Sequence, residues 1–340
     1  MSLDNNYNKT HLLHFMNLTI AICLFNKEKY IEKTIESICN QTFQNFELLI
    51  IDDCSTDRSI TIVKDYFKRH PRKYELVEFK ENKGIGYGRH FAERYATTKY
   101  MMFVDSDDIL YPYAVEKMYN RMVSDEELMA VGCFLEYIDK DGKKIGGGLF
   151  LGEKDKEAFY KKAEAKKLIF MQPTAIYDRE LALSVGGYVI DGYPEGKPRY
   201  QDYCEDLDLW TRMSDLYIQK KAIIVLPEVL CQYRKAEGLS ANSYNMILKM
   251  RYVKKNLLLR RSGGSNISFC NFLDNISESE LNKVKRDADA ADSLRNGVSY
   301  LRNHSLIKGI RLIIRSIWLK PGYIIDKIKN NLIRMPKILK

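Results

Sequence analysis

Residues 46–57 run Phe-Glu-Leu-Leu-Ile-Ile-Asp-Asp-Cys-Ser-Thr-Asp, an apolar stretch that ends in a cluster of polar side chains. A short run of this kind, closed by turn-forming residues, is typical of a buried strand followed by a loop. A second apolar run at 18–24 ends near Asn26, which we interpret as the cap of the next helix. Between the two runs, apolar residues recur at helical spacing: Tyr30, Ile31, Ile35 and Ile38. The order is therefore strand, helix, strand.

The same alternation continues along the chain. A helix is expected over 59–70, a strand over 74–79, a glycine-containing loop, a helix over 89–96 and a strand over 100–104. Such alternation predicts an α/β fold with a Rossmann-like, mainly parallel sheet flanked by helices. Ligands of these sheets bind beyond the carboxyl ends of the strands. Asp52-Asp53 and Asp105-Ser-Asp-Asp108 are therefore expected at one edge of the sheet.

Length and composition narrow the class of protein. The 340 residues suffice for about two domains, and 45% hydrophobic with 29% charged residues is ordinary for a soluble protein. Residues 1–15 lack the basic start and apolar stretch of a signal peptide, and we expect a disordered leader there. No uninterrupted apolar stretch of about 20 residues could span a bilayer. The cysteines form no C-x-x-C pair. We therefore expect a cytoplasmic protein with reduced thiols.

The positive charge is concentrated at the C-terminal end. Residues 305–340 hold nine basic residues and one acidic residue, so +8 of the net charge of +9 lies there. Five aliphatic residues mark one face of a helix in this tail: Leu306, Ile310, Ile313, Ile314 and Ile317. One interpretation is a helix lying in an anionic membrane interface, and the other is a helix packed on the rest of the protein with its basic face in water. Aliphatic periodicity does not favour nucleic acid.

A dense acidic cluster follows the strand expected over 100–104. Asp105, Asp107 and Asp108 place three carboxylates in four positions, which is costly unless a cation neutralises them. Oxygen ligands at this density suit Mg²⁺ or Mn²⁺, which are commonly shared with substrate phosphates. The alternative is an acidic turn that caps the next helix.

Six pieces of sequence together resemble the family 2 glycosyltransferases of the GT-A fold. They span about residues 16–240 and occur in the family's order. The pieces are Ile22-Cys-Leu-Phe-Asn26, the run 41–57, Asn82-Lys-Gly84, Asp105-Ser-Asp-Asp108, Gly186-Gly-Tyr188 and Glu205-Asp-Leu-Asp-Leu-Trp210. The resemblance implies a sugar-nucleotide donor, with a UDP-sugar as the commonest case.

The resemblance also implies roles for the donor-side residues. Asp53 would receive the nucleotide base, Cys23 and Phe25 would form the rest of that pocket, and Asp105 would lie near the ribose. Asp107 would hold the metal at the diphosphate, with Asp108 as an alternative ligand.

Two cations near the glycine-containing stretch 82–88 have two interpretations. In the family this loop closes one side of the donor site, so that Lys83 or Arg89 would meet the diphosphate. The alternative is a turn with a solvated cation. The stretch is not a dinucleotide-binding fingerprint, because it does not follow the first strand.

The second acidic cluster would supply the catalytic base. Inverting transfer needs a group that takes the proton of the acceptor hydroxyl, and by resemblance Asp206 does so while Glu205 orients hydroxyl groups. Asp208 and Trp210 fit the start of a helix, with Trp210 in the core. One departure concerns the metal, because the family often has a histidine where this chain has Ala236.

These observations predict a hexosyl- or N-acetylhexosaminyltransferase that is metal-assisted and inverting, acts on a glycan or lipid-linked acceptor, and lies in the cytoplasm or at the inner face of a membrane. The expected parts are a donor-binding half over 16–110, an acceptor-binding half of the same domain over 111–240 and a helical, basic region over 241–340. A nucleotidyltransferase that releases pyrophosphate remains an alternative. So does a non-catalytic protein that binds a glycan or nucleic acid.

Overall fold

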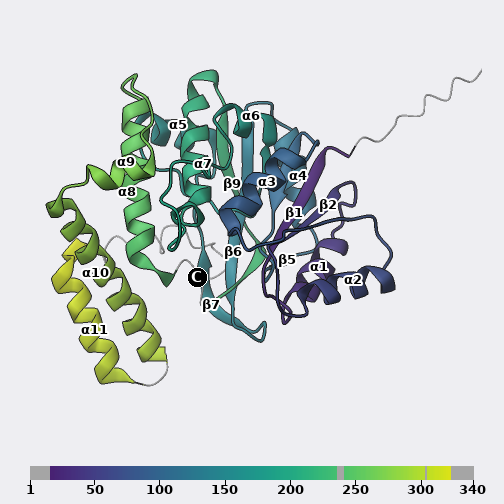
Figure 1. Cartoon of the computed structure of the whole chain (residues 1–340), viewed down its shortest axis with the longest axis horizontal. Helices are drawn as coiled ribbons and strands as arrows, with labels where there is room; N and C mark the ends of the chain where they lie inside the picture. Colours follow the sequence, from purple (N-terminus) through teal and green to yellow (C-terminus); the bar gives the residue numbers. More distant parts are fainter. Residues whose placement is uncertain (1–15, 236–240, 303–304, 323–340) are drawn as a thin grey trace, which may run out of the picture.

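The computed structural model describes residues 16–235, 241–302 and 305–322 (Figure 1). These residues form a nine-stranded sheet in the order β3-β2-β1-β4-β8-β6-β9-β5, with β7 paired to β6. The strands are β1 Leu18–Leu24, β2 Glu47–Asp52, β3 Glu75–Glu78, β4 Tyr100–Phe103, β5 Ile109–Leu110, β6 Leu128–Ile138, β7 Lys144–Leu149, β8 Ala175–Asp178 and β9 Ala222–Arg234. The first four are mutually parallel. The predicted α/β fold with a mainly parallel sheet is confirmed.

Helices cover both faces of this sheet (Figure 1). Seven α-helices fall within the sheet region: α1 Ile31–Cys39, α2 Ser59–Arg69, α3 Ile85–Tyr95, α4 Ala114–Val123, α5 Lys156–Glu164, α6 Arg179–Ser184 and α7 Glu205–Met213. Two 3-10 helices flank α7, namely η1 Tyr200–Asp202 and η2 Ser214–Gln219. The chain adds β2 and β3 on one side of β1 and then returns to place β4 on the other side. Because parallel crossovers are right-handed, this reversal puts α3 on the face opposite α1 and α2.

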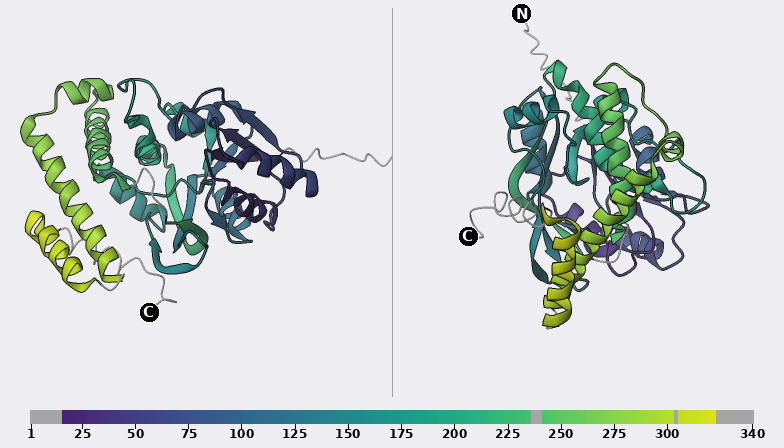
Figure 2. Two further views of the ribbon diagram at one scale, coloured as in Figure 1. Left: turned by 60° about the horizontal axis from the view of Figure 1, so that its bottom comes forward. Right: turned by 90° about the vertical axis from the view of Figure 1, so that its left-hand side faces the viewer.

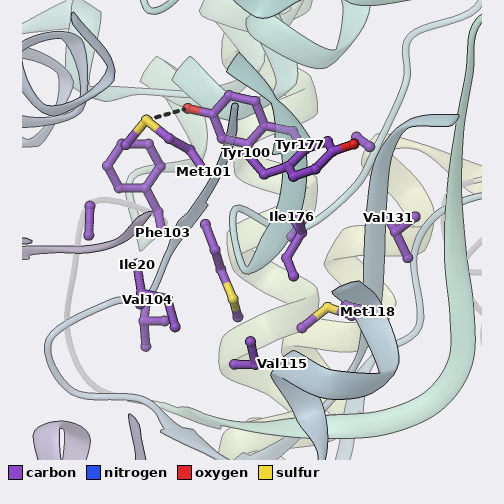
Figure 3. Close-up of a cluster of buried hydrophobic side chains, with 14 of the residues drawn as sticks. Ile20, Tyr100, Met101, Phe103, Val104, Val115, Met118, Val131, Ile176 and Tyr177 are labelled. Atoms are coloured by element: carbon purple, nitrogen blue, oxygen red, sulfur yellow. Dashed lines mark hydrogen bonds between the residues drawn. The ribbon is translucent and has the colours of Figure 1, made fainter. Parts of the chain in front are cut away.

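The core lies along the middle strands and explains their apolar sequences. Ile20, Met101 and Ile176 have no exposed surface, and neither does Val115 from α4. Figure 3 shows these side chains packed together with Tyr177, whose hydroxyl lies 3.7 Å from the sulfur of Met101. Strands buried on both faces show continuous apolar runs rather than alternation, which is why these segments could be recognised in the sequence.

A second, smaller core joins the C-terminal helices to the sheet domain. The helices are α8 Ser243–Arg260, α9 Phe269–Asp274, α10 Glu278–Arg302 and α11 Leu306–Leu319. This core includes Leu248 and Tyr252 of α8, Phe269 of α9 and Val284 of α10. Helix α8 packs on α7, and α10 packs on α8. Helices α10 and α11 lie side by side as a hairpin that projects from the body (Figure 2).

Several local predictions were wrong. Asn26 does not cap α1: it has a positive φ of 51°, and its side chain binds Thr56 instead. Helix α3 begins at Ile85 rather than at residue 89, so the supposed glycine loop is largely helix. Strands β5, β7 and β8 were not anticipated, because pairing with β9, β6 and β4 stabilises segments whose own pattern is weak.

Candidate active site

Three parallel strands end side by side and bring the acidic clusters together. Leu24 at the end of β1 pairs with Asp52 of β2, and Ala21 pairs with Phe103 at the end of β4. The residues that follow these strand ends therefore share one edge of the sheet, as the sequence predicted. Asp53 comes directly after β2, and Asp105 comes two residues after β4.

Asp53 fastens the segment that precedes α3. Its carboxylate accepts hydrogen bonds from the main-chain N–H groups of Lys83 at 2.6 Å and Gly84 at 2.8 Å, and from the Asn82 amide at 2.8 Å. Burial raises the pKa of Asp53, and the two main-chain hydrogen bonds oppose that rise. Asp53 therefore fixes the shape of the loop at the position where a nucleotide base was expected.

The glycines of α3 allow the helix to approach its neighbours closely. Gly84 precedes the helix with a φ of 92°. A Cβ on Gly86 would lie 2.7 Å from the carbonyl oxygen of Gln201, and one on Gly88 would lie 3.1 Å from the sulfur of Cys23. The glycine-rich stretch thus serves close packing of α3 against β1 and against the segment before α7. This packing carries Arg89 into the protein.

Arg89 joins the two acidic clusters. Its guanidinium donates to Asp105 Oδ1 at 2.8 Å and to Glu205 Oε1 at 2.6 Å, and the residue is 2% exposed. Burial lowers the pKa of Arg89, but Glu205 and Asp105 outweigh that effect and keep it charged. The interpretation of Arg89 as a solvated cation was wrong. The residue ties the end of β4 to the first turn of α7.

Helix α7 directs its first two carboxylates toward this edge. Burial raises the pKa of both Glu205 and Asp206, whereas the Arg89 charge lowers them. Asp206 is half-buried. Trp210, one helical turn further on, is fully buried, as predicted. Helix α7 therefore anchors its apolar side in the core while its N-terminal turn carries Glu205 and Asp206 beside Arg89.

Asp208 has a structural role. Its Oδ2 lies 3.1 Å from Arg212 Nε, and Arg212 also donates to the carbonyl oxygens of Val185 and Gly187. Although burial opposes it, Arg212 and Lys249 hold the pKa of Asp208 below its ordinary value. This carboxylate stays charged and holds α7 to the segment after α6.

Asp107 and Asp108 have different surroundings. Asp108 is 1% exposed, and its Oδ1 accepts a hydrogen bond from the Arg234 main-chain N–H at 2.9 Å. Burial raises the pKa of Asp108 well above its ordinary value, with Asp105 and Asp107 adding to the rise. Asp107 instead pairs with Lys27, whose ammonium lies 2.5 Å from its Oδ2. Asp108 thus secures β9, and Asp107 is the better placed of the two for a metal.

The chemistry of Asp107 fits a divalent cation. Its carboxylate already holds a cation, the Lys27 ammonium, and the side chain is 16% exposed. Mg²⁺ is usually bound by one or two carboxylates with substrate phosphates and water, so a single protein ligand is compatible with it. Within the described residues, no three His, Cys, Asp or Glu side chains are arranged as a metal site. Ala236 lies outside the described residues.

The remaining expected donor residues lie around the same edge. Phe25 follows β1 and is 41% exposed, which leaves its ring accessible for stacking. Cys23 is half-buried, and burial raises the pKa of its thiol to about 12, so it stays neutral. The Lys83 ammonium pairs with Glu81 at 3.3 Å and lies over the ring of Tyr87. Lys83 therefore contributes its main chain to the site, through Asp53.

Three residues connect the loop before α3, which we call the donor loop, to the segment before α7, and no sequence pattern marked this connection. We use "latch" for Asn82, Arg199 and Asp202. Arg199 donates to the Asn82 carbonyl oxygen at 2.7 Å, and Asp202 accepts from the Gly86 N–H at 2.9 Å. Arg199 and Asp202 also form an ion pair at 3.4 Å. Both follow a Gly/Pro-rich stretch without periodicity, so no sequence signal marked them.

Two further buried residues, Glu93 and Lys249, contact segments that pack around the site. Glu93 of α3 accepts a hydrogen bond from the Tyr188 N–H at 2.8 Å, which explains the Gly186-Gly-Tyr188 motif. Lys249 of α8 is 1% exposed and lies over the rings of Tyr193 and Tyr252. Burial lowers the pKa of Lys249 to about 8.

The sequence is similar to those of several known proteins. Residues 19–185 match the model of glycosyl transferase family 2. An uncharacterized glycosyltransferase of Haemophilus influenzae is 26% identical over 232 residues, covering 67% of this chain and 68% of that protein. Chondroitin synthase of Escherichia coli is 37% identical over 131 residues, 38% of this chain. A teichoic acid poly(glycerol phosphate) polymerase of Staphylococcus epidermidis is 30% identical over 158 residues, 45% of this chain. The matches cover only 19% and 22% of the latter two proteins.

Solved structures share the fold. TarS 1–349 of S. aureus, crystallised with UDP, gives a TM-score of 0.52 at 17% identity and covers 90% of this chain and 92% of that chain. The mannosyltransferase PcManGT of Pyrobaculum calidifontis, in complex with GDP-Man and Mn²⁺, gives a TM-score of 0.50 at 17% identity, covering 89% and 88%. The fold is therefore of the GT-A type.

Proposed function

Because its residues 19–185 make this chain a member of glycosyl transferase family 2, we propose that it moves a sugar from a nucleoside-diphosphate sugar to a hydroxyl group with inversion. The observation that carries the proposal is the Arg89 bridge, which unites the donor-side Asp105 with the Glu205-Asp206 pair of α7. The sugar is proposed to be a hexosyl or N-acetylhexosaminyl group.

The proposed reaction is a single displacement at the anomeric carbon. The acceptor oxygen forms a bond to this carbon while the bond to the diphosphate breaks, and Asp206 takes the hydroxyl proton. Asp206 suits this task because burial raises its pKa and makes it a better base than an exposed aspartate. Glu205, fixed by Arg89, would orient a sugar hydroxyl. A Mg²⁺ or Mn²⁺ ion at Asp107 would stabilise the negative charge of the leaving diphosphate.

We propose uracil as the base of the donor, with Asp53, Cys23 and Phe25 around it. TarS has been crystallised with UDP and with UDP-GlcNAc, and this supports a uridine donor. PcManGT holds GDP-Man and Mn²⁺, which supports a divalent ion without supporting uridine. The support is therefore stronger for a nucleotide-sugar donor than for uracil as its base.

The proposed acceptor is a glycan or a lipid-linked hydroxyl, and the proposed location is the inner face of a membrane. The names of two relatives, chondroitin synthase and teichoic acid polymerase, support a polymeric acceptor. None of the helices in the described residues is long and apolar enough to cross a membrane. We propose that contact with the membrane is peripheral.

The test is a screen of sugar nucleotides with Mn²⁺ or Mg²⁺, in which both released products are measured. Glycosyl transfer predicts release of a nucleoside diphosphate. Release of pyrophosphate would instead indicate a nucleotidyltransferase, and binding without any release would indicate a glycan-binding protein.

A further inference from the structure

Helix α11 exposes an apolar stripe that the transfer reaction does not use. Ile307 is 85% exposed and Trp318 is 80% exposed. Four more residues of the stripe are 44% to 64% exposed: Leu306, Ile310, Ile314 and Ile317. At 100° per residue, all six fall within about a third of the helix circumference. We call these six residues the α11 stripe.

The stripe faces away from α10 because α11 uses another side to pack. Ser316 Oγ donates to the Ala290 carbonyl oxygen at 2.8 Å. A Cβ on Gly309 would lie 3.0 Å from the Gly297 carbonyl oxygen, so these two glycines bring the helices close together. Helix α11 therefore packs on the protein, as one of the two sequence-based interpretations expected, and does so through α10. The apolar stripe stays in solvent.

Cations border the stripe. Lys308, Arg311 and Arg315 are exposed and occupy the next part of the circumference. Arg315 lies 3.8 Å from Asp289 of α10, and both side chains are 58% exposed, so this pair is weak. Helix α11 itself contains no acidic residue. Six more cations follow in the sequence: Lys320, Lys327, Lys329, Arg334, Lys337 and Lys340.

We propose that the α11 stripe is a docking face for an anionic lipid bilayer, with α11 lying in the interface. The helix has 14 residues and a length of about 21 Å, so it cannot cross a hydrocarbon core of about 30 Å. Large apolar side chains bordered by lysine and arginine are the pattern of interfacial helices. A second copy is a poorer occupant, because two α11 helices would bring like charges together. This docking face lies outside the catalytic site. Its binding to lipid does not depend on which sugar is transferred.

The two tryptophans give a direct measurement. Trp210 has no exposed surface in the core, whereas Trp318 belongs to the stripe. Vesicles of phosphatidylglycerol and phosphatidylcholine should shift the emission of the full chain to the blue. Trp318→Phe should abolish that shift but keep co-sedimentation, since it removes the fluorophore and preserves an apolar side chain. Vesicles of phosphatidylcholine alone should give weaker binding, and raising the salt from about 50 to 500 mM should weaken binding to the anionic vesicles.

Paired substitutions test the surface itself. Ile307→Ser with Ile314→Ser should reduce vesicle binding at least about tenfold, because it removes apolar area without changing charge. Ile218→Ser is the matched control: Ile218 is 74% exposed on η2, and its loss should leave vesicle binding unchanged. Circular dichroism and turnover of a soluble donor should be the same in all three proteins.

Two results would overturn the proposal. One is equal vesicle binding by the double variant and the wild type. The other is a wild-type dimer in size-exclusion chromatography that becomes monomeric in the double variant with no change in vesicle binding, which would make the stripe an interface between copies. If no donor were turned over but the stripe still bound vesicles, the proposed function would fail and this inference would stand.

Discussion

At the scale of single residues, the site depends on how each carboxylate is partnered. Asp105 and Glu205 share Arg89, Asp208 pairs with Arg212, and Asp107 pairs with the partly exposed Lys27. Among the described residues, the Asp206 carboxylate forms no salt bridge, although the Arg89 charge and the Leu207 main-chain N–H both lower its pKa. Arginine holds these carboxylates in place, whereas a base must be free to approach a hydroxyl group and accept its proton. This contrast separates Asp206 from its neighbours.

We predict that Asp206→Asn lowers the transfer rate by about 10²- to 10⁴-fold while donor binding changes little, because the amide keeps the shape but cannot take a proton. In the wild type, activity should fall as the pH falls through the pKa of Asp206. Since burial raises this pKa, the fall should begin at a higher pH than for an exposed aspartate. Rate–pH profiles and donor calorimetry measure both effects. Retention of more than about a third of the rate would move the base to Glu205.

We predict that Asp107→Ala abolishes turnover and weakens nucleotide binding only when Mn²⁺ or Mg²⁺ is present. The reason is that its carboxylate would hold the ion against the diphosphate. Calorimetry of UDP binding with and without metal is the measurement, and Asp108→Asn is a control expected to act through stability. The same loss of affinity in both conditions would remove Asp107 from the proposed metal site.

At the scale of elements, the latch couples the loop before α3 to the segment before α7. Asp53 holds Asn82, Arg199 holds Asn82 from the other side, and Asp202 holds the first turn of α3 at Gly86. The donor loop and the helix that carries the proposed base therefore share one set of hydrogen bonds.

We predict that Asp202→Ala lowers the free energy of unfolding by about 1–3 kcal/mol, because the buried Gly86 N–H loses its acceptor. Donor affinity should fall as well. Asp202→Asn keeps an acceptor oxygen and should cost less. Urea denaturation and UDP binding measure the two effects. Equal losses in both variants would mean that the ion pair with Arg199 matters more than the hydrogen bond.

The elements also show why some features could be predicted and others could not. Strands β1, β2 and β4 are continuous apolar runs, and parallel pairing brings their ends together, so the edge that holds Asp53 and Asp105 followed from pattern alone. The start of α3 did not, because Gly86 and Gly88 disfavour a helix locally and only their close contacts justify it. The burial of Arg89 depends on that same packing. Arg199 and Asp202 lie 117 and 116 residues from their partners, beyond any local signal.

At the scale of the whole molecule, the C-terminal helices divide into two parts. Helix α8 belongs to the enzyme body, since its buried Lys249 and Tyr252 pack beneath the segment that leads into α7. Helix α11 contacts α10 through Gly309 and Ser316. The two parts should therefore respond differently to truncation.

We predict that a chain ending at Asn303 stays folded and turns over a soluble donor at close to the wild-type rate. A chain ending at Asn242 should lose both properties, because α7 would lose its support from α8. Thermal unfolding and nucleoside diphosphate release measure these outcomes. Loss of turnover in the chain that ends at Asn303 would show that α11 belongs to the catalytic body.

The succession of packed helices has a geometric consequence. Helix α11 is fixed to α10, α10 is tied to α8 through the Arg251–Asp287 ion pair at 3.1 Å, and α8 packs on α7, whose first turn carries Asp206. A docked α11 would therefore set the height of the proposed base above the lipid headgroups. The enzyme would then encounter its acceptors by diffusion in the plane of the membrane. It would react only with hydroxyl groups that stand at that height.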